Sequence, residues 1–184
     1  MIKGNEEIRT KQAQASIGQI LLLEKYNKHF KKFNLGIAQF LLTSRELREK
    51  ESLENIKSTY NQVKNHAVAI VNENDVISVK ELSFGDNDNL AKELMLALDF
   101  DTLIILTKKG QLIKNGKKLT KTNLYRPEDY DAIKIETGGS GGLKSKLDCA
   151  KFLIDNNKKV FIGKYSDGLL EIISDKNKRT EFVK

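Results

Sequence analysis

The stretch AVAIVNEND, residues 67–75, decides the fold that we expect for this chain. Its apolar start has no polar alternation, and such continuous runs are typical of strands that are covered on both faces. Three further short runs share this character, at residues 37–42, 103–106 and 160–162. Amphipathic stretches with helical spacing separate the runs, at residues 12–28, 44–65, 89–100 and 145–156. This alternation predicts an α/β fold, a three-layer α/β/α sandwich in which a mainly parallel sheet carries helices on both sides.

Two of the predicted helices begin beside residues that suit a helix cap. Ser44 is expected to cap the helix over 44–65, and Asp88 or Asn89 the helix over 89–100, because short polar side chains accept from the first helical N–H groups. The polar, lysine-rich segment 108–136 lacks clear periodicity and contains Asn115-Gly116, a favoured hairpin turn. We expect this segment to be a surface excursion rather than a separate domain.

Length and composition exclude several classes of protein. The 184 residues fit one domain, and no run approaches the ~18 apolar residues that a membrane helix needs. The opening MIKGNEEIRT has no apolar segment, so no secretory signal is expected. Cys149 is the single cysteine, which rules out an internal disulfide, and we expect it to be a small core residue. These features predict a soluble, reduced, cytoplasmic protein.

The formal net charge of +7 is unevenly distributed. Residues 72–101 are strongly acidic, and residues 108–146 are strongly basic. This separation of acidic from basic residues is compatible with a site that binds cations and anions in different places. It is equally compatible with two charged faces that only contact solvent. Nucleic-acid binding has little support, because the basic stretch contains few aromatic residues for base stacking. His29 and His66 are isolated, so no zinc site or other metal site within the chain is predicted.

Two polar motifs in the acidic region are candidate binding loops. Residues 72–75, Asn-Glu-Asn-Asp, follow a predicted strand, where open α/β sheets bind their ligands. Such amides and carboxylates can hold the charged groups of an amino acid, although a plain polar loop would look the same. Residues 84–90, FGDNDNL, lead into a helix and carry more carboxylate than a cap requires. Ala91 and Ala97 stand where a calcium loop needs glycine and glutamate, so that alternative fails.

A glycine-rich motif, TGGSGGLKSK at residues 137–146, opens the last predicted helix. Small residues leave backbone N–H groups free to bind phosphate oxygens, and the start of a helix favours negative charge. Leu143 replaces the glycine that the common P-loop pattern requires, so this is an anion loop of another type. A flexible linker is the alternative interpretation.

In their order along the chain, these motifs resemble those of the glutamate 5-kinases in the amino-acid kinase family. The KQA at 11–13 and IGQ at 17–19 resemble the family's KQA…VGQ helix, and AQFLLT at 38–43 its AQVLLT strand. VNEND at 71–75, FGDNDNL at 84–90 and SGGLKSK at 140–146 resemble its INEND, FGDND-L and TGGMxTK motifs. Each short match is weak, but the ordered set is specific.

The resemblance implies phosphorylation of the γ-carboxylate of L-glutamate by ATP with Mg2+, the first step of proline biosynthesis. It implies substrate binding by Asp75, Asn87, Asp86 and Asn72, and catalytic roles for Lys146 and Asp88. It implies nucleotide contacts from the following residues: Thr107, Ser140, Gly141, Gly142, Leu143, Lys144, Ser145 and Lys146. It also implies in-line transfer without a covalent enzyme intermediate.

The same resemblance has departures. Ten residues precede Lys11, whereas the family places two strands, a phosphate loop and a substrate loop before the KQA helix. We therefore expect residues 1–184 to form a single, N-terminally incomplete kinase domain without the family's C-terminal RNA-binding-like domain. Lys108 follows Thr107 where the family has an aspartate. A non-catalytic relic that binds nucleotide or a partner is the alternative function, and exposed apolar surface predicts a homo-oligomer.

Overall fold

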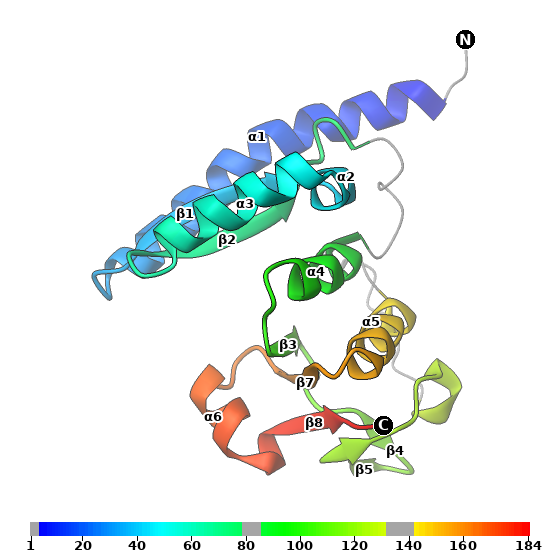
Figure 1. Cartoon of the computed structure of the whole chain (residues 1–184). Helices are drawn as coiled ribbons and strands as arrows, with labels where there is room; N and C mark the ends of the chain where they lie inside the picture. The colour runs from blue at the N-terminus through cyan, green and yellow to red at the C-terminus, as the bar shows by residue number, and fades with distance from the viewer. Residues whose placement is uncertain (1–3, 79–85, 132–141) are drawn as a thin grey trace. The chain divides into compact units, whose positions relative to one another are not determined.

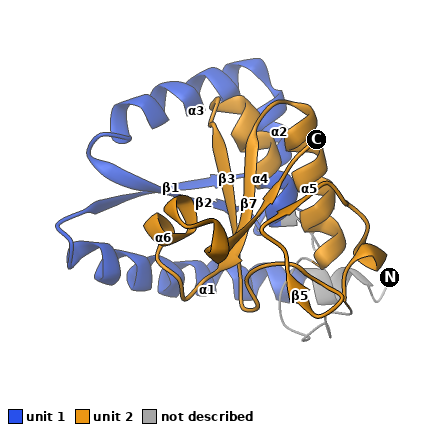
Figure 2. Cartoon of the chain, turned by 90° about the horizontal axis from the view of Figure 1, so that it is seen from below, with its two compact units in different colours: residues 1–90 blue, residues 91–184 orange. Residues whose placement is uncertain are grey.

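The computed structural model describes residues 4–78, 86–131 and 142–184. It divides into two compact units, residues 1–90 and 91–184, which are considered separately here (Figure 2). Helix α4, Asp86–Ala97, contains the boundary between them. Each unit combines helices with strands that pair mainly in parallel, which confirms the predicted α/β class.

The first unit is a two-stranded sheet between helices. Strands β1, Gly36–Leu42, and β2, Ala67–Glu73, pair in parallel from Gly36 opposite Ala67 to Leu42 opposite Glu73. Helix α1, Gly4–Lys31, lies along one side, and α3, Lys50–Val63, lies along the other (Figures 1 and 2). The short helix α2, Ser44–Arg48, directly follows β1. This is the expected three-layer arrangement on a small scale.

The cap of α2 differs from the predicted one. Thr43, not Ser44, is the N-cap: its hydroxyl accepts from Arg45 N, and its own N–H donates to Glu46 Oε2 at 2.7 Å. This reciprocal capping box uses the residue that directly follows the apolar strand. The predicted single helix over 44–65 is also wrong, because extended backbone at Glu49 separates α2 from α3.

The second unit contains a four-stranded mixed sheet in the order β3-β7-β8-β6. Strand β3 spans Thr102–Thr107 and pairs in parallel with β7, which spans Lys159–Lys164. Strand β8, Arg179–Phe182, is antiparallel to β7. It also pairs in parallel with the short strand β6, Lys121–Thr122. The remaining elements are β4, Ile113–Lys114; β5, Lys117–Lys118; α5, Leu143–Asp155; α6, Leu169–Ser174; and the 3-10 turns Pro127–Asp129 and Lys176–Lys178.

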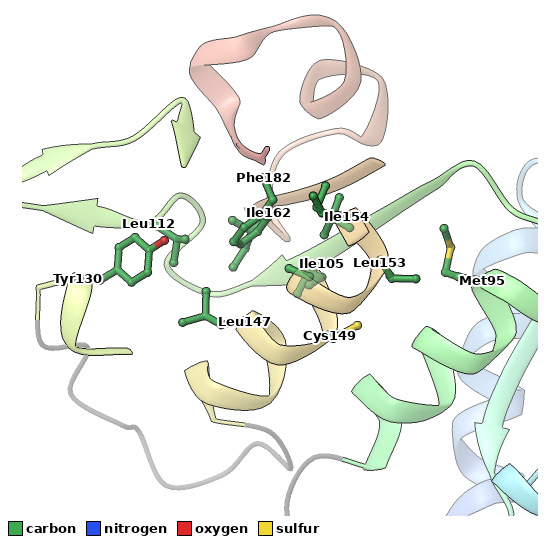
Figure 3. Packing of buried hydrophobic residues seen from close by; sticks show 12 residues of the cluster. Met95, Ile105, Leu112, Tyr130, Leu147, Cys149, Leu153, Ile154, Ile162 and Phe182 are labelled. Atoms are coloured by element: carbon green, nitrogen blue, oxygen red, sulfur yellow. The ribbon is translucent and has the colours of Figure 1, made fainter. Parts of the chain in front are cut away.

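Alternating side chains of β7 hold helices on both faces of this sheet. Val160 and Ile162 enter the main hydrophobic cluster with α5, where Leu147 of that helix is fully buried (Figure 3). Gly163 faces α6: a Cβ there would come within 2.8 Å of the Ile172 side chain, so a larger residue would force this buried isoleucine to shift. Cys149 also belongs to the cluster, as predicted.

Several predicted boundaries shift in the structure. β2 continues through Glu73, so Asn72 lies inside the strand rather than after it. α4 already begins at Asp86, which places Asp88 and Asn89 within its first turn instead of at its N-cap. α5 begins at Leu143, so the second half of the glycine-rich motif is helical. Side chains in this first turn project from a fixed backbone and not from a loop.

The segment that follows β3 is only partly a surface excursion. The hairpin turn at Asn115-Gly116 is confirmed: both residues have positive φ, 52° and 73°, and they join β4 to β5. However, Leu112 and Tyr130 are buried in the main cluster (Figure 3).

Within the described ranges, no helix combines the length and apolar character that crossing a bilayer would require.

Candidate functional site

A hydrogen-bonded turn follows β2 and carries Asp75. Asn74 N donates to Leu42 O at the end of β1, and Asn74 O accepts from the N–H groups of Ile77 and Ser78. Gln12 of α1 donates to Ser78 O at 3.4 Å. The turn is thus fixed to the neighbouring strand and to the helix, which gives Asp75 a defined position.

A cavity of about 230 Å³ opens beside this turn, within the first unit. Its lining comes from α1, from β1 and from the end of β2: Ala15, Ser16, Gln19, Ile20, Leu23, Gln39, Leu41, Glu73, Asn74, Asp75 and Val76. Carboxylates, amides and aliphatic side chains therefore meet in one small space. This combination can hold an ammonium group, a carboxylate and a short hydrocarbon chain together.

Burial affects the carboxyl group of Asp75. Partial removal from water raises its pKa above the usual range, because the charged form loses hydration. Glu73, its neighbour in the cavity wall, is only 6% exposed. A positively charged group entering the cavity would offset the cost of keeping Asp75 ionised there.

Asn72 is the one member of the 72–75 motif that does not line the cavity. Consecutive side chains of a strand point to opposite faces, so Asn72 faces away from Glu73 and from α1. Its Oδ1 is buried and finds no hydrogen-bond partner among the described residues. The structure therefore brings Asp75 to the cavity but not Asn72.

The acidic motif before α4 becomes the first turn of that helix. Asp86, Asn87 and Asp88 are its first three residues; the side chain of Asn87 is exposed, and that of Asp88 is partly buried. Carboxylates in a first turn are stabilised by the helix dipole. The side chain of Asp86 and residues 79–85 lie outside the part of the chain that the structure describes.

In the second unit, Thr107 ends β3 and shapes a tight turn. Its hydroxyl accepts from Gly110 N at 2.8 Å. Gly110 has a φ of 80° and lies so near β7 that a Cβ would approach the Lys164 Cβ to 2.9 Å. The exposed side chains of Lys108, Lys109 and Lys164 surround this turn, at the carboxyl ends of two parallel strands.

The N-terminus of α5 lies at the same edge of the sheet. At the far end of the helix, Lys158 N donates to Leu153 O and Lys159 N to Asp101 O, which places the helix C-terminus beside the amino ends of β3 and β7. The helix therefore starts near the carboxyl ends, where its N-terminal N–H groups favour an anion.

The described part of the glycine-rich motif forms the cap and first turn of α5. Gly142 is the N-cap, and Ser145 Oγ donates to Gly142 O at 3.0 Å. The side chain of Lys144 is exposed, and that of Lys146 is half-buried. Ser140 and Gly141 lie outside the described residues. The edge therefore combines a helix N-terminus, Thr107 and several lysines in one basic region.

Sequence reasoning missed Gln19, Gln39 and Ser16 as lining residues. The available signal was the row Ala15, Gln19, Leu23, whose four-residue spacing places the three on one face of α1. Two other apolar residues of this helix, Ile17 and Leu21, do not mark the cavity face, since they are 67% and 56% exposed and do not line the cavity.

Comparison with known proteins identifies the family of this chain. The model of the amino acid kinase family matches residues 2–164. Glutamate 5-kinases from Bacillus cereus (strain B4264) and Bacillus anthracis are each 39% identical over 166 residues, which covers 85% of this chain and 45% of each relative. Glutamate 5-kinase 2 from Bacillus subtilis (strain 168) is 34% identical over 178 residues, or 91% of this chain and 48% of the relative. The chain spans about half the length of these relatives, and it belongs to the amino acid kinase family.

Proposed function

We propose that this chain takes part in the ATP-dependent phosphorylation of the γ-carboxylate of L-glutamate, which supplies proline biosynthesis. The names of its relatives support this reaction class. The single observation that carries the proposal is the cavity beside Asp75, because its lining matches the groups of a small acidic amino acid.

The size and chemistry of the cavity favour glutamate over a nucleotide. Its volume of about 230 Å³ is below the ~300–1,000 Å³ of typical pockets for drug-sized ligands. In this proposal, the carboxylate of Asp75 accepts from the substrate ammonium group, and Leu23 and Leu41 contact its methylene groups. Asn87 and Asp86 would bind substrate from the acidic helix start, whereas the predicted substrate contact of Asn72 has no support from the cavity, whose lining does not include it.

ATP is proposed to bind at the basic edge of the second unit. Its phosphates would lie against the N-terminus of α5, contacted by residues of the glycine-rich motif: Ser140, Gly141, Gly142, Leu143, Lys144, Ser145 and Lys146. Thr107 would contact the nucleotide from the end of β3. The positive charge at this edge is the supporting observation.

Lys146 is proposed to stabilise the negative charge that spreads over the transferred phosphoryl group. Lys146 lies in the first turn of α5 and is half-buried, so its side chain starts from a fixed backbone at the helix N-terminus. Phosphoryl transfer depends mainly on positioning and charge neutralisation, so a fixed cation is the expected catalytic device. Asp88 would act from the same acidic helix start as Asn87, which is proposed to bind L-glutamate.

Magnesium would be held largely by ATP itself. No group of three or more histidine, cysteine or acidic residues in the described ranges could bind a metal ion. Mg2+ commonly uses substrate phosphates together with few protein ligands, so the phosphate oxygens of ATP would supply most of its ligands. The bound metal supplies charge neutralisation on the phosphates.

The test is an assay with ATP, Mg2+ and L-glutamate in which hydroxylamine traps the acyl phosphate as a hydroxamate. Lys146→Ala should lower kcat by about 10²–10³-fold, the usual effect of losing one group that stabilises the transition state. Lys159→Ala is the matched control, because Lys159 is exposed at the amino end of β7.

Equal rates for Lys146→Ala and the wild type would refute the role of Lys146. Glutamate and ATP binding without any turnover in the wild type would favour the alternative, a non-catalytic protein that binds nucleotide or a partner. Calorimetric titration with each ligand separates these results.

A further inference from the structure

Gln19 places a buried hydrogen-bond donor in the wall of the cavity. The residue lies in the middle of α1 and lines the same space as Asp75. Its Nε2 is buried and has no hydrogen-bond partner among the described residues. Gln12, on the same helix, instead donates to Ser78 O. Of these two glutamine side chains, Gln19 is therefore the one whose amide N–H groups can donate to a ligand in the cavity.

A buried amide donor is costly unless something accepts its hydrogen bonds. Leaving such a group unsatisfied typically costs more than an ordinary hydrogen bond contributes, and the strongest acceptors are carboxylates. A carboxylate beside the Gln19 amide would satisfy the donor. The cavity thus offers a donor from α1 and a carboxylate acceptor, Asp75, from the turn after β2.

We propose that Gln19 determines specificity for an α-amino acid by donating from its side-chain amide to the substrate's α-carboxylate. This inference rests on the proposed function. The ammonium and α-carboxylate groups share one carbon, so a single small cavity with a donor and an acceptor fits that end of the molecule. The γ-carboxylate must stay accessible to the phosphoryl donor and is the less suitable partner.

The experiment compares two ligands that differ by this one group. Isothermal titration of the 184-residue chain uses L-glutamate and 4-aminobutyrate, which lacks the α-carboxylate. Gln19→Leu should weaken L-glutamate binding about 10- to 100-fold, the range for losing a hydrogen bond to a charged group. Binding of 4-aminobutyrate should change by less than about threefold, since its missing group is the one that Gln19 contacts.

Two further variants keep the result interpretable. Gln19→Glu preserves the size of the side chain but replaces the donor with a charge that repels a carboxylate, so it should lose at least as much affinity for L-glutamate. Gln14→Leu removes an exposed glutamine from the same helix, outside the cavity, and should bind like the wild type. Circular dichroism checks that each variant is folded.

The possible outcomes are distinguishable. Unchanged L-glutamate binding in both Gln19 variants would overturn the role of Gln19 and leave the proposed function intact. Equal losses for L-glutamate and 4-aminobutyrate would overturn the assignment to the α-carboxylate. If the wild-type chain binds no L-glutamate, the proposed function fails and this inference fails with it.

Discussion

Leu147→Ala tests whether α5 is held by the packing seen in the second unit. Leu147 is fully buried next to Leu112 and Tyr130 (Figure 3). The substitution removes three carbon atoms, and at about 0.8 kcal/mol for each buried group the transfer loss is about 2.4 kcal/mol. The cavity left behind raises the upper bound to about 5 kcal/mol. This is a large fraction of the ~5–15 kcal/mol that stabilises a typical domain.

Urea unfolding followed by far-UV circular dichroism measures the effect, since the chain has no tryptophan for fluorescence. With an m-value of about 2 kcal/mol/M, the midpoint should fall by about 1.2 M or more. Leu170→Ala is the matched control, because Leu170 is 81% exposed on α6. Its free energy of unfolding should change by at most about 0.5 kcal/mol. Equal midpoints for the two variants would refute the packing described for α5.

Two further predictions concern the first unit. Asp75→Asn should raise the thermal midpoint at neutral pH and weaken L-glutamate binding. Burial raises the pKa of Asp75, so the stability associated with its neutral form is present at low pH and lost as the pH rises through the folded-state pKa. The gain in the variant should vanish near about pH 3, and an equal gain there would contradict this cause. Ile17 and Leu21 are exposed one turn apart on α1, and we expect the chain to self-associate through them. The double variant Ile17→Gln, Leu21→Gln should weaken this association at least about tenfold, as measured by light scattering. A monomeric wild type would contradict this.

The two halves of the proposed chemistry fall in separate units. The first unit holds Asp75 and Gln19 around the cavity, and the second holds Thr107 and Lys146 at its basic edge. The uneven distribution of charge along the sequence follows this division. Most of the net charge of +7 therefore lies in the second unit, where the phosphate site is proposed.

The sequence alone determined the elements whose signals are local. Continuous apolar runs located four of the strands, and β2 and β3 each lie within two residues of the predicted limits. The Asn115-Gly116 turn was also predictable, because only residues that tolerate positive φ fit a tight hairpin. The ordered motifs indicated the family, which the comparison confirmed.

Tertiary structure decided the features that depend on contacts between distant residues. Leu112 is buried in the hydrophobic cluster, and its N–H donates to Thr180 Oγ1, 68 residues away. Gln111 donates to Arg179 O across the same separation. No periodicity in the segment after β3 could reveal these bonds. The C-terminal elements α6 and β8 were missed for the same reason, since they are short and depend on packing against β7.

The same limit applies to the site. The sequence indicated Asp75, because a polar motif that follows an apolar strand can be recognised without any structure. It could not show that Asn72 points to the other face, since that depends on where β2 ends. Nor could it show that Gln19 lines the cavity, because Ile17 and Leu21 mark the exposed side of α1. Apolar spacing identifies a helix, but only the contacts made on folding decide which side is buried.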